Sequence, residues 1–129
     1  ITANPDYEKE AYATLKAFSA EVEKMPSAFP LVLVALDFLF GPSNEIVIAG
    51  RAGAEDTQAM LAAVRKPFLP NKVLVFRPDG NPDAIAKLSP YTKTQASQDG
   101  KATAYVCRNF ACELPTTDIK KMLESLGVE

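Results

Sequence analysis

Three short runs of β-branched and other apolar residues recur along the chain, at 45–49, 72–76 and 103–107. None of them alternates polar with apolar residues, which is typical of strands covered on both faces. Segments with helical spacing separate the runs and follow the last one. Strands that alternate with helices favour a parallel sheet with right-handed crossovers. The fold class predicted for residues 41–129 is therefore α/β: a small three-layer domain with a mostly parallel sheet of three or four strands.

The helices of this domain are predicted from the residues at their ends. Residues 54–65 have apolar residues at helical spacing and end before Pro67, and a short helix is expected over 82–88. Residues 89–101 are polar and read as a loop. Thr117 or Asp118 caps a last helix that runs to Leu126 and stops at Gly127.

Residues 1–40 predict a helical hairpin. Asn4 caps the first helix, which stops at Pro26, and Ser27 caps a second one that reaches about residue 40. The second helix is apolar nearly all round, a pattern typical of a helix buried on several sides. One sheet face cannot cover it, so we expect an exposed apolar patch or a contact with another copy of the chain. Its one charge, Asp37, is interpreted as solvent-facing, or else as a buried polar contact or part of a site that lines a neighbouring domain.

Composition excludes several kinds of chemistry. The 129 residues include no histidine, which removes Ser-His-Asp and Cys-His catalysis and every zinc site that needs imidazole. A net charge of −2 gives no electrostatic reason to expect nucleic acid or an anionic membrane. The longest apolar run, 29–40, is too short to span a bilayer, and residues 1–6 lack the features of a signal peptide. We predict a cytoplasmic protein without cofactor, metal or catalytic residue.

The two cysteines, Cys107 and Cys112, are separated by four residues. A four-residue hairpin loop over 108–111 would place them opposite each other, at a distance that a disulfide can span. Three interpretations stay open: two reduced core thiols, a disulfide or redox pair, and a metal site, for which two thiolates alone are a poor ligand set. A disulfide over so short a loop contributes only about 2 kcal/mol. In a cytoplasmic protein we expect thiols whose replacement costs packing rather than activity.

A glycine-containing turn follows the first predicted strand. Gly50, Arg51 and Gly53 stand where a helix begins, so backbone amides and the helix dipole could hold an anion. The turn matches neither a dinucleotide fingerprint nor a phosphate-binding loop with its lysine. A tight strand-to-helix turn that needs small residues explains the same pattern.

Residues 99–118, which include both cysteines and the run Pro115-Thr116-Thr117-Asp118, resemble the carboxy-terminal module of the thioredoxin-domain-containing YyaL family, also described as spermatogenesis-associated protein 20-like. Residues 45–50 and 68–73 resemble the preceding segments of that family, in order. The resemblance implies a protein several times longer, with a thioredoxin-like domain and a helical toroid similar to epimerases and six-hairpin glycosidases. It also implies that residues 1–40 are the last helices of the toroid.

Two functions follow from these observations. The first is a non-catalytic accessory domain that packs against the toroid of a larger protein of uncharacterised activity. It fits the missing histidine, the missing cofactor motif and the over-apolar second helix. The second is a redox module in which Cys107 and Cys112 exchange electrons with the thioredoxin-like domain of the same protein. The implied partners are the toroid, the thioredoxin-like domain and, through the helical hairpin, another copy of the chain.

Overall fold

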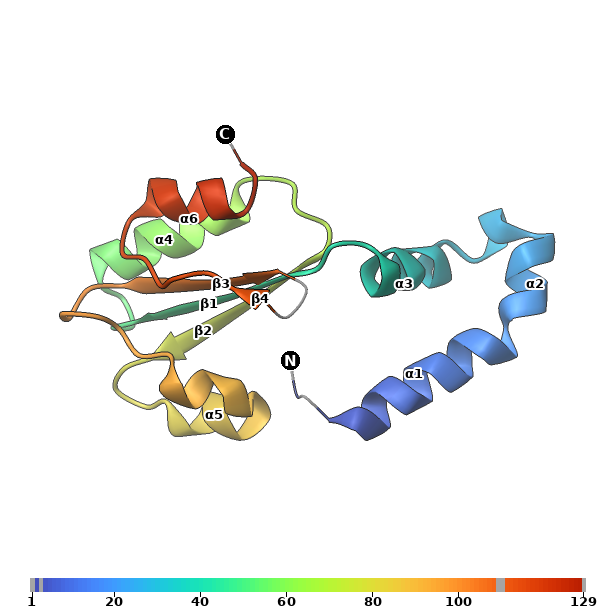
Figure 1. The fold of residues 1–129 in the computed structure, drawn as a ribbon, viewed down its shortest axis with the longest axis horizontal. Coiled ribbons are helices and arrows are strands. Elements are labelled where there is room, and N and C mark those ends of the chain that lie inside the picture. The colour runs from blue at the N-terminus through green and yellow to red at the C-terminus, as the bar shows by residue number, and fades with distance from the viewer. Residues whose placement is uncertain (1, 3, 109–110, 129) are drawn as a thin grey trace. The chain divides into compact units, whose positions relative to one another are not determined.

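The structure is a computed structural model that describes every residue except 1, 3, 109–110 and 129 (Figure 1). The chain forms two compact units, a helical unit of residues 2–41 and an α/β unit that holds residues 42–129. The described residues of the first unit contain helices alone, and the sheet lies in the second.

The α/β unit is a mixed sheet with helices on both of its faces. The strands are β1 (Asn44–Gly50), β2 (Lys72–Pro78), β3 (Thr103–Arg108) and β4 (Ala111–Cys112), and the helical elements are α4 (Glu55–Arg65), α5 (Asp83–Leu88), the 3-10 helix η2 (Pro90–Thr94) and α6 (Ile119–Ser125). The strand order is β2-β1-β3-β4. Strands and helices thus lie where the sequence predicts them, apart from η2, which replaces part of a predicted loop. Asp118 caps α6 through its carboxylate, which accepts the amides of Lys120 and Lys121.

The prediction of a mostly parallel sheet is wrong for the third strand. β1 and β2 are parallel, with Val47 beside Val75, whereas β3 runs antiparallel to β1, with Val47 beside Tyr105. The chain leaves β2 at Pro78, passes through α5 and η2, and re-enters the sheet at the end where β2 finished, because Thr103 at the start of β3 pairs with Ala49 near the end of β1. A tight turn at Asp99 and Gly100, both with positive φ, then leads directly into β3.

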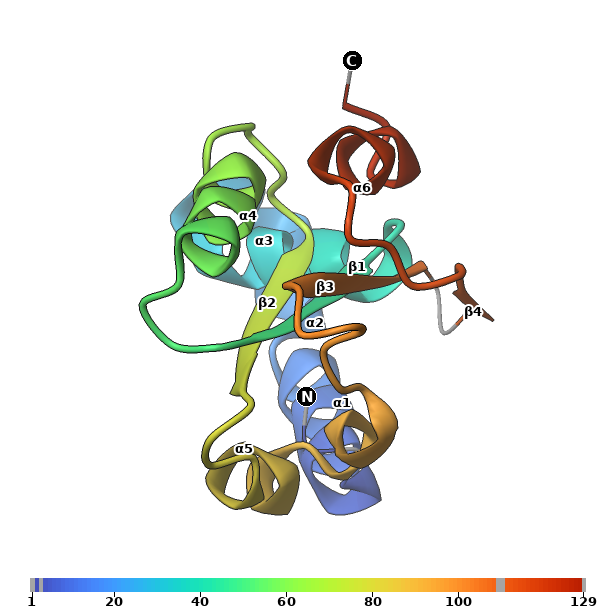
Figure 2. The same cartoon turned by 90° about the vertical axis from the view of Figure 1, so that its left-hand side faces the viewer.

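The main core lies between one face of the sheet and helices α4 and α6. Ile46 and Ile48 of β1 are fully buried there, together with Met60 of α4 and Met122 of α6. Figure 2 shows α4 and α6 on one face and α5 on the other. Because both faces are covered, the strands carry apolar residues without alternation, as the sequence indicates.

The helical unit consists of α1 (Pro5–Ala17), α2 (Ser19–Lys24), the 3-10 turn η1 (Pro26–Ala28) and α3 (Pro30–Phe40). The Asn4 side chain accepts a hydrogen bond from the Asp6 amide at 2.9 Å, so the predicted cap is present. A break at Phe18 divides the first predicted helix into two. Ser27 lies within η1 and does not cap the second helix. The reason is Pro30: a residue that precedes proline disfavours the helical conformation, so α3 begins at the proline.

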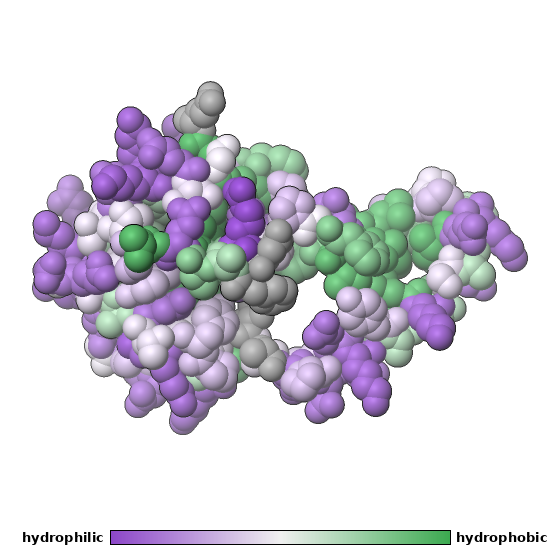
Figure 3. Space-filling view, in the orientation of Figure 1, coloured by the Kyte–Doolittle hydropathy of each residue, from purple (hydrophilic) through white to green (hydrophobic). Residues whose placement is uncertain are grey.

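The helical unit has almost no core of its own. Among its described residues only Val22 is buried, while Leu31 and Phe40 of α3 are 82% and 77% exposed. Figure 3 shows an apolar area over this part of the chain. In the described part of the chain, no helix combines the length and the apolar character needed to cross a membrane.

Candidate functional site: a disulfide hairpin and an uncovered helix

The cysteines lie opposite each other in the β3–β4 hairpin. Cys107 pairs with Cys112 in the register, their Cα atoms are 3.8 Å apart, and a disulfide joins their sulfurs. Pairing extends one step beyond them, to Arg108 and Ala111. The predicted four-residue loop over 108–111 is therefore too long, since both of its ends belong to strands. Residues 109 and 110, which the prediction placed in that loop, lie outside the described part of the chain.

The two halves of the disulfide differ in their exposure to solvent. Cys107 is 5% exposed, because its strand lies inside the sheet between β1 and β4. Cys112 belongs to the two-residue edge strand and is exposed. Of the two cysteines, Cys112 is therefore the more open to an incoming thiol.

Side chains and backbone groups tie the hairpin to the rest of the α/β unit. Arg108 donates from Nε to the Asn44 side-chain oxygen at 3.3 Å and from Nη2 to the Ser125 carbonyl at 3.4 Å. The Ser125 hydroxyl in turn donates to the Glu113 carboxylate. The Glu113 amide donates to the Val106 carbonyl at 2.9 Å. The hairpin is thus held to β1 and to α6 as well as by its own disulfide.

A carboxylate lies opposite the buried cysteine, and its charge acts on a nearby phenol. Glu45 is directly opposite Cys107 across β1 and β3, so the two side chains share one face of the sheet. Burial raises the pKa of Tyr91, and the Glu45 carboxylate raises it further. Sequence analysis missed Glu45 because only the antiparallel register of β1 and β3 places it beside a cysteine.

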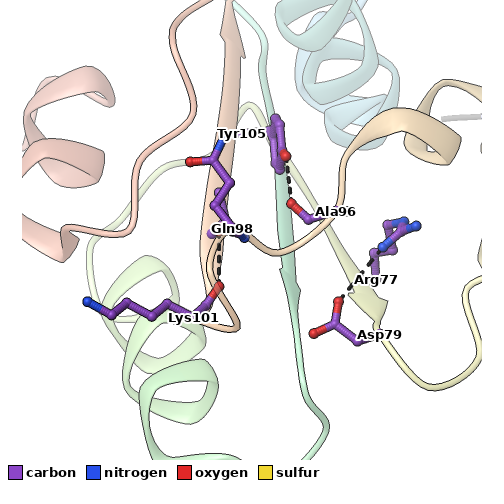
Figure 4. Close-up of polar contacts among 7 residues, drawn as sticks. Arg77, Asp79, Ala96, Gln98, Lys101 and Tyr105 are labelled. Atoms are coloured by element: carbon purple, nitrogen blue, oxygen red, sulfur yellow. Dashed lines mark hydrogen bonds and ion pairs between the residues drawn. The ribbon is translucent and has the colours of Figure 1, made fainter.

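The same face of the sheet continues toward Arg77 and Tyr105. The Tyr105 hydroxyl donates to the Ala96 carbonyl at 2.6 Å, and Arg77 forms an ion pair with Asp79 at 3.9 Å (Figure 4). Burial raises the pKa of Tyr105, while the Arg77 charge acts in the opposite direction. The Tyr105 bond joins β3 to the segment that precedes it, whereas the Arg77–Asp79 pair lies at the end of β2.

The chemistry available to the hairpin is thiol–disulfide exchange. The chain has no histidine, and the described residues contain no group of three or more cysteines and carboxylates that could hold a metal ion. General base catalysis by imidazole therefore has no residue to carry it in this sequence.

The glycine turn after β1 is explained by packing. A Cβ on Gly50 would lie 2.5 Å from the Thr57 hydroxyl oxygen, and Gly53 has a φ of +78°. The Asp56 carboxylate accepts hydrogen bonds from the Ala102 amide at 2.7 Å and from the Thr57 amide at 2.8 Å. The Ala102 bond is the main cause that lowers the pKa of Asp56. The Asp56 carboxylate already lies at the start of α4, where the helix dipole would attract an anion. Anion binding at Gly50, Arg51 and Gly53 stays a prediction.

Helix α3 presents the other unusual surface. An apolar groove of 460 Å³ lies between α1 and α3. The side chains along it are mostly apolar and include Ala11, Leu15, Val32, Ala35, Phe38 and Leu39. Outside the groove, Val34 and Phe40 are 63% and 77% exposed, and Asp37 is exposed as well. The helix that the sequence predicts to be buried on several sides is thus uncovered in this chain.

These features define a small mixed α/β domain with a disulfide-closed hairpin, preceded in the chain by a helical unit whose apolar side chains are largely exposed. The chain is homologous to spermatogenesis-associated protein 20. It is 35% identical to the human protein over 127 residues, and 32% identical to the rat and mouse proteins, with 95% of this chain covered in each case. The resemblance to spermatogenesis-associated protein 20 that the sequence suggested is therefore confirmed.

The chain spans only 16% of the length of these relatives. The homology therefore concerns one part of a much longer protein. No family model matches the sequence, and no solved structure matches it either.

Proposed function

We propose that this chain is a non-catalytic accessory region of a larger protein, which packs against the rest of that protein through its helical unit. The main observation that supports this proposal is the exposure of α3, an eleven-residue helix with a single charged residue, Asp37. Interfaces that form permanently resemble a domain core cut in half, whereas transient ones are about as polar as the rest of the surface. The composition of α3 fits the permanent kind.

The occupant of this surface is a helical part of the same polypeptide. Two facts support it: the homologous proteins are about six times as long as this chain, and the groove between α1 and α3 has the apolar lining that suits a helix. In the finer form of the proposal, the occupant is a helical toroid of the YyaL type, preceded by a thioredoxin-like domain. The predicted cytoplasmic location and the predicted contact between copies of the chain also stay proposals.

The test compares substitutions on α3 in two contexts. Val34→Gln and Phe40→Gln place polar groups on the uncovered side of α3, and Lys9→Gln in α1 is the matched control. In the longer protein that contains this chain, burial of each apolar side chain is worth about 1.5–3 kcal/mol, so both α3 variants should lower the melting temperature of a protein about six times as long by about 1–2 °C. In the chain of residues 1–129 alone, where both side chains are exposed, they should leave melting nearly unchanged.

Equal effects in the two contexts would contradict the proposal, because the side chains would then be packed within their own unit. The absence of any effect in the longer protein would contradict it as well. Size-exclusion chromatography of the isolated chain checks the other occupant: if the chain forms a dimer that Phe40→Gln dissociates, a second copy covers α3.

A redox module is the second candidate function, and one observation favours it. The structure joins Cys107 and Cys112 in a disulfide whose Cys112 half is exposed. In a cytoplasmic protein the glutathione pool keeps most such pairs reduced, so a pair that forms a disulfide there would have to cycle. The partner would be the thioredoxin-like domain of the larger protein.

Thiol titration before and after mild reduction, combined with an activity screen of the longer protein, tests this candidate. A folded Cys107→Ser variant that has lost the activity found for the longer protein would support the redox module. A variant with full activity would leave the cysteines a structural role.

A further inference from the structure

The Cys107–Cys112 disulfide is open to attack at one end. Thiol–disulfide exchange begins when a thiolate reaches a disulfide sulfur, so its rate depends on access to that sulfur. Cys112 lies on the exposed edge strand β4, whereas Cys107 is 5% exposed between β1 and β4. Attack at Cys112 leaves the departing electron pair on the Cys107 sulfur.

The surroundings of Cys107 disfavour a negative charge on its sulfur. From β1, the Glu45 carboxylate lies directly opposite Cys107 on the same face of the sheet. From η2, Tyr91 is near enough to Glu45 for its pKa to respond to that charge, and Tyr105 of β3 is neutral at pH 7. Arg77 of β2, a cation on this face, pairs with Ala49, four residues or about 13 Å further along β1 than Glu45. A thiolate on Cys107 would thus be buried beside a carboxylate.

We propose that the Cys107–Cys112 disulfide exchanges with dithiols at Cys112 alone, and that Glu45 slows this exchange by opposing the thiolate that forms on Cys107. The proposal deepens the redox candidate, on which it rests for the class of partner, a dithiol. Cys112 is the sulfur that forms the mixed disulfide, Cys107 is the leaving group, and Glu45 tunes the leaving group without touching the incoming thiol.

Reduction of the disulfide by a dithiol takes two steps. A thiolate of the dithiol bonds to the Cys112 sulfur, the bond between the two protein sulfurs breaks, and its electron pair leaves on Cys107, which takes a proton from solvent. The second thiolate of the dithiol then attacks the dithiol's own sulfur in the mixed disulfide. This step releases Cys112 as a thiolate, which is protonated, and leaves the dithiol as a cyclic disulfide. Two electrons pass from the dithiol to the protein.

The site of attack is tested by trapping the mixed disulfide. The full chain is treated with glutathione under native conditions, quenched with N-ethylmaleimide in denaturant, and digested for peptide mass spectrometry. We expect glutathione on Cys112 and maleimide on Cys107. Glutathione on Cys107, or in equal amounts on both, would overturn the proposal. So would a disulfide that neither glutathione nor dithiothreitol opens under native conditions.

The role of Glu45 is tested by the rate of reduction with dithiothreitol at pH 7. Removing the carboxylate makes a thiolate on Cys107 easier to form, and a disulfide breaks faster when its leaving thiol is more acidic, so Glu45→Gln should be reduced severalfold faster than the wild type. Glu55→Gln, in the first turn of α4 and away from the hairpin, is the control and should react at the wild-type rate. Equal rates in wild type and Glu45→Gln, with matching melting curves, would overturn the proposal.

Different results would contradict the redox function and the one-sided exchange at Cys112. If glutathione is found on Cys112 and Glu45→Gln reacts faster, but the activity of the longer protein does not depend on the cysteines, the redox function fails and the one-sided exchange stands. If exchange occurs at both sulfurs, the present proposal fails whatever the larger protein does.

Discussion

The close contact between Gly50 and Thr57 makes a quantitative prediction about the turn after β1. A Cβ added at Gly50 would lie 2.5 Å from the Thr57 hydroxyl oxygen, and Thr57 is fully buried, so its side chain has little room to move away. Overpacking of this kind costs about 1–3 kcal/mol. The loss of chain freedom in the unfolded state returns about 0.4–1 kcal/mol. Gly50→Ala should therefore lower the free energy of unfolding by about 1–2 kcal/mol, as measured by urea denaturation.

A second substitution at Thr57 separates this contact from other effects. Thr57→Ala removes the atom that would clash, so the double variant Gly50→Ala, Thr57→Ala should be less destabilised than the sum of the two single variants by about 1 kcal/mol or more. Thr57→Val keeps an atom at the crowded position and should give no such rescue. Additive effects in the Thr57→Ala cycle, or a Gly50→Ala variant as stable as the wild type, would refute the reasoning.

Three further predictions concern stability. Hydrogen bonds lower the pKa of Asp56 in the folded state, so its contribution to stability is present above the ordinary carboxyl pKa and lost as pH falls through the folded one. Asp56→Asn should therefore flatten the fall in melting temperature below the ordinary carboxyl pKa. Burial raises the pKa of Tyr91, so its contribution to the free energy of unfolding is present below about pH 10 and lost as pH rises through the pKa of the folded state. Tyr91→Phe should therefore make the stability of the chain less sensitive to alkaline pH in a denaturation series. Met122 is fully buried against the sheet, so Met122→Ala should cost about 2–4 kcal/mol in urea denaturation, and a loss below 1 kcal/mol would mean that α6 does not close the core.

Local patterns predicted the elements of the α/β unit well, because the same forces act in the sequence and in the fold. Asp118 is a good cap in isolation, and it caps α6. The unbroken apolar run of β1 follows from cover on both faces, which the structure provides. Neither pattern carries information about the direction of a strand. The direction of β3 depends on where the chain re-enters the sheet.

A signal for that direction is present in Asp99-Gly100. Both residues adopt positive φ, and the Lys101 amide donates to the Gln98 carbonyl at 2.9 Å. An Asp-Gly pair favours tight turns with this backbone conformation. Sequence analysis treated residues 89–101 as a plain loop and so passed over the turn that leads into β3.

The candidate site was only partly predictable for the same reason. The spacing of the cysteines is enough to propose that they face each other across a hairpin. The residue opposite Cys107 on β1 depends on the register between β1 and β3. That register pairs residues about 60 positions apart in the chain, so no local pattern predicts it. Glu45 became part of the site only when that register was known.

The two units of the chain differ in the source of their stability. In the α/β unit, side chains from β1, α4 and α6 are fully buried against one another, so its fold is supported from within. In the helical unit, α1 and α3 have thirteen and eleven residues and contribute no fully buried side chain. Isolated helices of that length are marginal in water, and most helical stability in proteins comes from packing of an apolar face. The apolar surface of α3 is therefore best explained as one side of a contact with a partner, which is the premise that the substitutions at Val34 and Phe40 put to the test.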